Sequence, residues 1–268
     1  MRQSKYMMLT LAAGLAGCQS SSGPQMSHLF VRLTDAPAPA LASAQVWIST
    51  VYLVGSDGTS RFTITTGPST EYDLLDFQGG VTALLGDLTI PAGDYAQLRL
   101  IVDSARVTLA GGVLFSDGTD SRDLKVPSGP QTGIKVEFGG PVHIAPGQTS
   151  LVVDFDVARS FVFQGPSDSP HGVLFKPVLH GTVSDQAGSI SGTSSPAAAL
   201  GMLFAINGPD TVATAAADPG TGAYVLQFLP PGTYTVADSS TVTGHKAASQ
   251  TVTVGVAQHV SGVDFTLP

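Results

Sequence analysis

Cysteine is almost absent from this sequence of 268 residues: Cys18 is the only one. A single cysteine excludes an internal disulfide and any metal site built from several thiolates. Domains of 100 to 150 residues bury enough apolar surface to fold without disulfides, so this shortage does not exclude an oxidising compartment. The lone cysteine therefore calls for a role other than cross-linking.

Charge is also scarce, and positive charge most of all. Only 12% of the residues are charged, and 12 Lys and Arg stand against 20 Asp and Glu, for a net charge of −8. Proteins that bind nucleic acid or adhere directly to anionic lipid need clustered positive charge. The composition therefore excludes both kinds of partner.

Signatures of catalysis are missing as well. No H-E-x-x-H zinc motif and no G-x-S-x-G nucleophile elbow occurs. His171 and His180 are the nearest pair of histidines, and a loop-then-strand placement does not bring them together by itself. The sequence predicts a protein that is not an enzyme, with no cofactor and no metal centre.

Two sets of aspartates keep other chemistry open. Asp117, Asp120 and Asp123 recur at every third position of a Gly/Ser/Thr-rich loop, and calcium prefers such oxygen-rich loops. The EF-hand spacing is absent, which favours a solvated turn. Asp154 and Asp156 share one face of an expected strand and would suit a hydrolase if desolvated. Capping or a salt bridge, with Arg99 or Lys176, is the simpler interpretation of this pair.

Long apolar runs are absent too, since the one at the N-terminus, residues 6–17, is shorter than the roughly 20 residues that cross a membrane. Arg2 and Lys5 precede it, and Leu15-Ala16-Gly17-Cys18 ends it, which is the pattern of a signal peptide. These four residues resemble the lipobox of bacterial lipoproteins. The resemblance implies a signal peptide at 1–17 and acylation of Cys18. An ordinary signal peptide and an uncleaved short anchor are the alternatives.

The segment 18–27 is then expected to be a flexible tether of Gly, Pro, Ser and Gln that holds the protein near a bacterial membrane. Loss of the leader would take the net charge from −8 to −10, because Arg2 and Lys5 leave with it. Gln19 after the cysteine resembles the default signal for the outer membrane of proteobacteria. The expected location is extracytoplasmic, facing the periplasm or at the cell surface.

Glycine (31) and proline (18) are abundant, and Thr, Ser and Val are frequent. This mixture favours many short strands joined by turns. We predict an all-β fold of two consecutive β-sandwiches, immunoglobulin- or prealbumin-like, at 28–183 and 184–268. Within the first, residues 45–54 should contain a β-bulge because the apolar alternation slips there, residues 81–85 should form a helical turn, and residues 173–183 should be the last strand. Trp47 should belong to the core.

Two sequence motifs occur in both halves of the chain. Ile90-Pro91-Ala92-Gly93-Asp94-Tyr95 is echoed by Leu229-Pro230-Pro231-Gly232-Thr233-Tyr234, and residues 151–157 are echoed by 260–267. In both members of the first pair Pro and Gly make a turn and Tyr opens the next strand. The repetition indicates two sandwiches of one plan, the first enlarged by an insertion at 103–140. Independent use of the same hairpin chemistry is the alternative.

The first half resembles a family of bacterial lipoproteins known only as a domain of unknown function. The matching pieces are Leu33-Thr34-Asp35-Ala36-Pro37, Tyr72-Asp73-Leu74-Leu75, residues 90–95, Pro127-Ser128-Gly129 with Gly133 and Lys135, Asp154-Phe155-Asp156 with Ser160, and Lys176-Pro177-Val178. The second half is similar to carboxypeptidase-regulatory-like sandwiches through Gly181-Thr182-Val183, Gly222-Ala223-Tyr224, residues 229–234, Gly244 and Val263-Asp264-Phe265. The first resemblance implies no activity, and the second implies an accessory module.

The sequence thus favours a lipid-anchored binding or scaffold protein, for example an accessory subunit docked on the periplasmic face of a membrane complex. Its partners would be the membrane, through the lipid, and other proteins. Edge strands and the apolar segment 197–204 would be its contact surfaces. A carbohydrate-binding or adhesion protein would instead show exposed aromatic rings in a groove. A hydrolase would show a pocket where Asp154, Asp156 or a histidine meets a second polar group.

Overall fold

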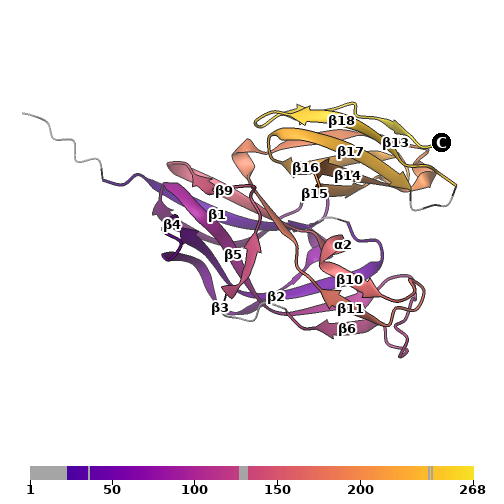
Figure 1. Cartoon of the computed structure of the whole chain (residues 1–268), viewed down its shortest axis with the longest axis horizontal. Coiled ribbons are helices and arrows are strands. Elements are labelled where there is room, and N and C mark those ends of the chain that lie inside the picture. Colours follow the sequence, from indigo (N-terminus) through magenta and orange to yellow (C-terminus); the bar gives the residue numbers. More distant parts are fainter. Residues whose placement is uncertain (1–22, 36, 127–131, 241, 243) are drawn as a thin grey trace, which may run out of the picture.

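The computed structural model describes residues 23–35, 37–126, 132–240, 242 and 244–268, and it is almost entirely β. The expected signal peptide, the lipobox with Cys18, the first part of the tether and Pro127-Ser128-Gly129 lie outside the described residues. Two β-sandwiches, each with its own hydrophobic core, follow one another along the chain. Figure 1 shows the C-terminal sandwich, orange to yellow, lying over one side of the N-terminal sandwich.

The N-terminal sandwich packs a four-stranded sheet against a six-stranded one. The first sheet has the order β12-β9-β1-β4. Its strands are β1 (Met26–Asp35), β4 (Ala83–Pro91), β9 (Gly147–Phe155) and β12 (Leu179–Val183). The second sheet comprises β2 (Leu41–Gly55), β3 (Arg61–Asp73), β5 (Gly93–Leu109), β6 (Ser121–Leu124), β7 (Ile134–Val136) and β8 (Val142–Ile144). A separate hairpin joins β10 (Phe161–Gln164) to β11 (Gly172–Phe175).

Alternating apolar residues explain how these strands face the core. In β1, Leu29, Val31 and Leu33 are completely buried, while the residues between them point outward. The expected slip in β2 is confirmed, because its register with β3 shifts between Ile48 and Thr50. Trp47 lies on the outward face of β2 and is half-buried, so the expectation of a core position is wrong.

The C-terminal sandwich pairs two four-stranded sheets. One comprises β13 (Gly188–Ser195), β16 (Ala223–Leu229), β19 (His259–Val260) and β20 (Phe265–Thr266). The other has the order β15-β14-β17-β18, with β14 (Gly201–Asn207), β15 (Asp210–Ala216), β17 (Gly232–Ser240) and β18 (Ala248–Val254). Strand β13 was not expected, since Ser and Gly dominate it and its sequence is typical of a linker.

The two sandwiches have the same plan. In each, the first strand pairs antiparallel with one neighbour and parallel with another: β1 with β4 and β9, β13 with β16 and β19–β20. The facing sheets also correspond, since β3-β2-β5 matches β15-β14-β17 and β8 matches β18. Strands β6 and β7 have no counterpart, which confirms the insertion expected at 103–140. Strands β10, β11 and β12, which follow β9, have no counterpart either.

Three local expectations are corrected. The helical turn lies at η1 (Leu74–Phe77), where the Asp73 carboxylate accepts from Leu75 N, and residues 83–85 begin strand β4 instead. The last strand is broken into β11 and β12 around Pro177, which has no N–H for a sheet. Strand β1 starts at Met26, two residues inside the segment expected to be tether.

The remaining helical pieces are short. They are α2 (Val157–Ser160), η2 (Ser184–Gln186) and η3 (Ala197–Ala199). None of the helices in the described part of the chain is long and apolar enough to span a membrane.

The motif repeated at residues 90–95 and 229–234 forms the same hydrogen-bonded corner in both sandwiches. Tyr95 Oη donates to the carbonyl oxygen of Pro91 at 2.7 Å, and Tyr234 Oη donates to that of Pro230, in both cases four residues back. Each ring is buried in its own core, 4% and 1% exposed. Because β4 and β5, like β16 and β17, belong to opposite sheets, the corner fixes the point where the chain crosses the sandwich.

Removing either hydroxyl should therefore cost stability. Tyr95→Phe and Tyr234→Phe should each lower the free energy of unfolding by about 1 kcal/mol, because a buried carbonyl loses its donor. Urea denaturation followed by circular dichroism measures the loss. Tyr72→Phe, at a half-buried position, is the control and should change stability by less than about 0.5 kcal/mol. Equal effects of all three substitutions would contradict a special role for the corner.

Candidate functional site

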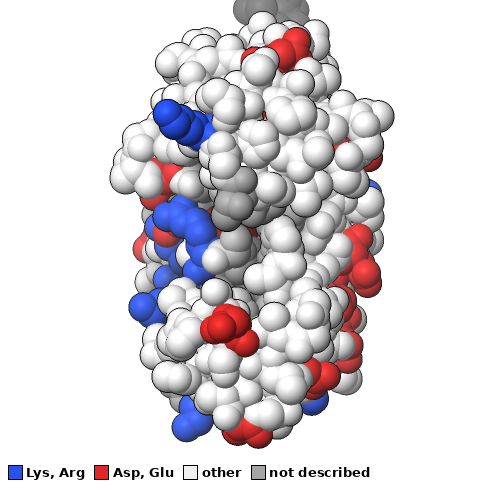
Figure 2. Space-filling model, turned by 90° about the vertical axis from the view of Figure 1, so that its right-hand side faces the viewer, with Lys and Arg blue, Asp and Glu red and all other residues white. Residues whose placement is uncertain are grey.

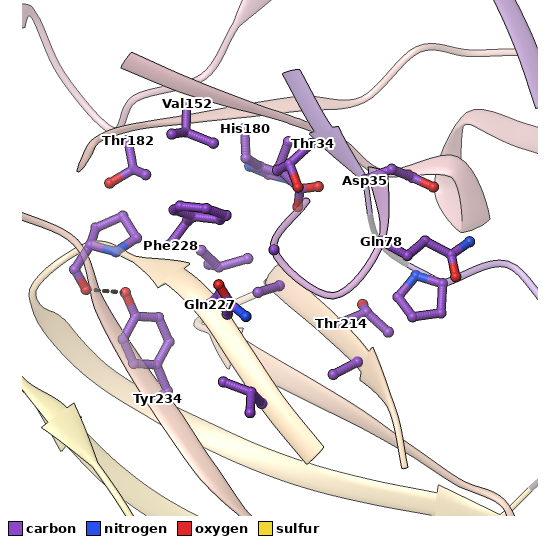
Figure 3. Close-up of a pocket in the computed structure, with 18 of the residues that line it drawn as sticks. Thr34, Asp35, Gln78, Val152, His180, Thr182, Thr214, Gln227, Phe228 and Tyr234 are labelled. Carbon is purple, nitrogen blue, oxygen red and sulfur yellow. Dashed lines mark hydrogen bonds between the residues drawn. The ribbon is translucent and has the colours of Figure 1, made fainter. Parts of the chain in front are cut away.

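A cleft of about 1370 Å³ lies between the two sandwiches (Figure 3). Its floor is the outer face of β1, β9 and β12. Thr34, Asp154 and His180 are direct cross-strand partners on these three strands, so their side chains share this face. Val152 and Thr182 form the next row. Although this face points away from the N-terminal core, Thr34, Val152 and Thr182 are only 4%, 1% and 7% exposed. The segment 77–81 covers Thr34, whose hydroxyl contacts the carbonyl oxygens of Phe77 and Val81, and the C-terminal sandwich lies over Val152 and Thr182.

The roof of the cleft is the side of the C-terminal sandwich where two sheet edges lie together. Strands β15 and β16 are the edge strands of their sheets, and consecutive residues 212–216 all line the cleft. Figure 3 shows Gln227 and Phe228 on this side, facing Val152 and Thr182. Phe228 has a positive φ of 54°. Such a conformation costs a non-glycine residue of order 1–2 kcal/mol and is found preferentially at functional sites.

Few polar contacts join the sandwiches. Gln227 Nε2 donates to the carbonyl oxygen of Gly79 at 3.1 Å, and Arg159 Nη1 donates to that of Thr211 at 3.4 Å. Gly80 permits the first contact, because a Cβ there would lie 2.2 Å from Gln227 Oε1. The covalent link between the two sandwiches is short, because β12 leads through η2 into β13.

Asp154 is the unusual residue of the floor. Its carboxyl has no hydrogen-bond partner among the described residues. Desolvation, with a smaller contribution from the nearby charge of Asp156, raises its pKa to about 8. The side chain lies inside a narrow cleft, and the upward direction of the pKa follows from this enclosure.

His180 and Asp156 complete the polar group. Burial lowers the pKa of His180 below the usual value of an imidazole, although the charge of Asp156 opposes this shift. His180 Nε2 is buried without a partner. Asp156 does not line the cleft: its Oδ1 accepts from Arg159 N at 2.9 Å and caps α2, and burial raises its pKa. The expected capping role is thus confirmed for Asp156, and the two carboxylates do not face one substrate.

The second sandwich contains a natural comparison for Asp154. Since Asp35 pairs with Phe155 and Ser194 pairs with Phe265, Asp264 occupies the position equivalent to Asp154. Asp264 Oδ1 accepts from N and Oγ1 of Thr193 at 2.8 and 2.9 Å. Thr193 is the equivalent of Thr34.

Thr34 does not help Asp154 in this way. Its hydroxyl lies 2.9 and 3.0 Å from the carbonyl oxygens of Phe77 and Val81 and donates to them. The same strand position therefore holds a satisfied, exposed carboxylate in one sandwich and an unsatisfied, enclosed carboxyl in the other.

The calcium candidates do not converge. Asp117 accepts from Thr119 and pairs with Arg122 at 2.7 Å, which with these hydrogen bonds lowers its pKa, and Asp123 pairs with Arg106 at 3.3 Å. Asp120 lies between Asp117 and Asp123 in the sequence. In the described ranges no three His, Cys, Asp or Glu residues come close enough to hold a metal ion.

Other expected contact residues are divided between surface and core. In the segment 197–204, Leu200 is 42% exposed, but Leu203 is completely buried. His171 is not among the residues that line the cleft with His180. Figure 2 shows a face that is largely uncharged, with isolated acidic groups and with Lys and Arg gathered along one side.

Sequence reasoning singled out Asp154 but missed His180 as its neighbour. It also missed Phe228 and the open edge of β15. One signal was available: residues 151–155 (LVVDF) are apolar on both faces of the strand, and such a run indicates that both faces are covered.

Comparison with protein families gives one match. The model of a domain of unknown function, DUF4382, matches residues 26–177, which includes strands β1 and β9 of the floor but not β12. None of the curated proteins matches the chain.

Solved structures of pilins and of another bacterial protein are similar only at a low level. They include the Bacillus anthracis TIE protein (11% identity, TM-score 0.20), a streptococcal ancillary pilin (12%, 0.23) and GBS52, the minor pilin of Streptococcus agalactiae (13%, 0.24). The matches cover 90%, 91% and 90% of this chain, and 34%, 63% and 95% of those chains. The chain thus spans about a third of the first and less than two thirds of the second. Likeness at this level does not support an inference about function.

The raised pKa of Asp154 predicts a pH-dependent stability. An aspartate has a pKa near 3.9 in an unfolded chain, so the folded protein keeps this proton up to about pH 8. The contribution of Asp154 to the free energy of unfolding should therefore fall as pH rises from 4 to 8, by at most about 1.4 kcal/mol per unit, and then level off.

Asp154→Asn should flatten this part of the pH profile and stabilise the protein at pH 8. Urea denaturation followed by fluorescence of Trp47, the only tryptophan, reports on the N-terminal sandwich. Asp264→Asn is the matched control and should keep the slope that Asp154 produces. Parallel profiles for wild type and Asp154→Asn would show that this carboxyl is ionised in the folded protein.

Proposed function

We propose the function of this chain from its own residues, because it belongs to the DUF4382 family, whose description assigns no activity. The chain is a lipid-anchored, extracytoplasmic, non-enzymatic binding protein. Cys18 holds it at a bacterial membrane, and the cleft between the sandwiches is the surface that a partner occupies. Docking on the periplasmic face of a larger membrane complex is the form of this function that fits a short tether best.

The cleft is the observation that carries this proposal. A protein interior normally pairs each buried polar group, and an unpaired one costs about 1–3 kcal/mol. Asp154 and His180 Nε2 lie side by side in the cleft without partners. An open sheet edge and a strained aromatic residue, Phe228, face them. A ligand that supplies the missing contacts would recover this cost on binding.

The anchor is supported by sequence alone. Residues 2–18 have the basic start, short apolar run and small residues before a cysteine that acylation requires. In the structure, β1 begins at Met26, so only the segment 19–25 separates Cys18 from the folded body. Lipid chains on Cys18 would keep the cleft within a short distance of the membrane.

Acid–base hydrolysis is the second candidate, because Asp154 and His180 do meet in one cleft, as a hydrolase would require. It ranks second because Asp156, the other carboxylate considered, caps α2 and does not reach the cleft. Carbohydrate binding has less support. Phe138 and Phe228 are only half-buried in the cleft, but Trp47 lies on the outward face of β2, away from it.

Replacing Cys18 tests the anchor. In a bacterial host that acylates lipoproteins, the wild type should incorporate labelled palmitate and fractionate with membranes, whereas Cys18→Ser should do neither. Ser20→Ala, two residues away, is the control and should behave as wild type. Membrane retention of Cys18→Ser would contradict the proposal.

Site-specific cross-linking tests the cleft. A photoreactive phenylalanine analogue at position 228 should form adducts of discrete size in living cells, because it faces the partner. The same analogue at position 47, on the outward face of β2, should not. Adducts at position 47 alone, or equally at both positions, would place the contact surface elsewhere.

A further inference from the structure

The charges around the cleft point to the chemistry of its ligand. The acidic residues that line it or lie next to its floor are Asp35, Glu137, Asp154, Asp156, Asp210 and Asp218. Against them the lining contains one Lys or Arg side chain, that of Arg159, whose Nη1 donates to a backbone carbonyl. Asp218 is satisfied within its own turn, and Glu137 pairs with Lys135 at 2.9 Å. Asp154 and Asp210 are left without such a partner among the described residues, so Asp154 lies in an acidic surrounding that a cation would neutralise.

The shape of the cleft points to a polypeptide as the carrier of that cation. Strand β15 pairs with β14 on one side only. The Thr211 carbonyl of this edge points to the N-terminal sandwich, since Arg159 reaches it from there. An edge strand presents unpaired N–H and C=O groups, and an extended segment pairs with them. The cleft volume of about 1370 Å³ exceeds the roughly 300–1,000 Å³ of typical small-molecule pockets.

We infer that the cleft takes an arginine or lysine side chain from an extended segment of a partner protein, with the main chain of that segment along β15 and its cationic group against Asp154. This inference rests on the proposed function and names the ligand chemistry of the same cleft. The unpartnered His180 Nε2 lies next to Asp154 and accepts a second N–H from the same guanidinium or ammonium group.

The equivalent position in the C-terminal sandwich shows what the inference requires. Asp264 accepts two hydrogen bonds from Thr193 and is exposed, so it has no need of a ligand. Asp154 accepts neither bond among the described residues, and the hydroxyl of Thr34 is directed to the carbonyl oxygens of Phe77 and Val81 instead. An incoming basic side chain would supply to Asp154 what Thr193 supplies to Asp264.

Binding of the cation is coupled to release of a proton. In the empty cleft the pKa of Asp154 lies at about 8, and a positive charge beside the carboxyl favours its ionised form. Asp156 is the charged group that acts on Asp154, and Asp156, Arg159, Asp210 and Glu137 act on the neighbouring His180. Asp35 from β1 also lines the cleft, but its carboxylate accepts from Val157 N. Since His180 has a lowered pKa, it is neutral from pH 6.5 to 8, and Asp154 dominates in this range.

The test is a binding titration with the full chain and a blocked peptide, acetyl-Ser-Val-Thr-Arg-Thr-Val-Ser-amide. A second peptide replaces the arginine with citrulline, which has the same shape and no charge. Calorimetry should give an affinity at least tenfold higher for the arginine peptide at pH 8. The affinity should rise by up to roughly tenfold per pH unit from pH 6.5 to 8 and stay constant above pH 8. The citrulline peptide should show no such dependence.

Two variants locate the effect. Asp154→Asn should bind both peptides equally and lose the pH dependence, whereas Asp264→Asn should behave as wild type. If Asp154→Asn does not fold, the affinities of the wild type for the two peptides, measured across the pH series, still test the inference. A third peptide, with methylated amide nitrogens around the arginine, should bind at least tenfold more weakly, because it cannot pair with β15.

Equal binding of the arginine and citrulline peptides, or no binding of either, would overturn the inference. So would strong binding of a neutral oligosaccharide that competes at Phe228, since the ligand would then be uncharged. None of these results touches the proposed function, which depends on labelling of Cys18 and on cross-links at position 228. Cross-links without a preference for arginine would leave the cleft as the binding surface with another ligand chemistry.

Discussion

The structure depends on how the outer face of sheet β12-β9-β1 is covered. A sheet of this kind normally turns one face to its core and the other to water. Here the second face is closed by the edge of another sandwich and by the segment 77–81, and Thr34, Val152 and Thr182 are removed from water as a result. The closure is incomplete, and the space that remains contains a carboxyl without a donor and an imidazole nitrogen without a partner. The cleft, its electrostatics and the shifted pKa values all follow from this imperfect fit.

Because the two sandwiches have the same plan, the unpaired carboxyl in one of them can be compared with its equivalent in the other. The two sandwiches share strand order, the Tyr–Pro corner and the Val-Asp-Phe segment of the last strand. They differ at Asp154 and Asp264, although each aspartate has a threonine beside it on the neighbouring strand, Thr34 and Thr193. A scaffold needs the arrangement seen at Asp264. The arrangement at Asp154 costs stability and therefore indicates a role other than holding the fold.

The sequence predicted the fold class, the β2 bulge, the repeated plan and the insertion, because each depends on local patterns: apolar alternation, turn residues and recurring phrases. It misplaced the helical turn at η1 and missed β13. Glycine and serine make β13 look like a linker, yet Gly192 is where the strand lies against its neighbour, since a Cβ there would be 2.0 Å from the Val263 carbonyl oxygen. The cleft could not be predicted, because the row Thr34–Asp154–His180 depends on register between strands more than 20 residues apart, and its roof depends on how two domains meet.

The link between the sandwiches has a mechanical consequence. Strand β12 is part of the floor and continues through the three residues of η2 towards β13, so the chain passes from one sandwich to the other beside the cleft. A link this short keeps the facing surfaces at high local concentration, and few polar contacts, among them the hydrogen bonds of Gln227 and Arg159, then need to join them. The link and these contacts together set the spacing of the two sandwiches, and with it the width of the cleft.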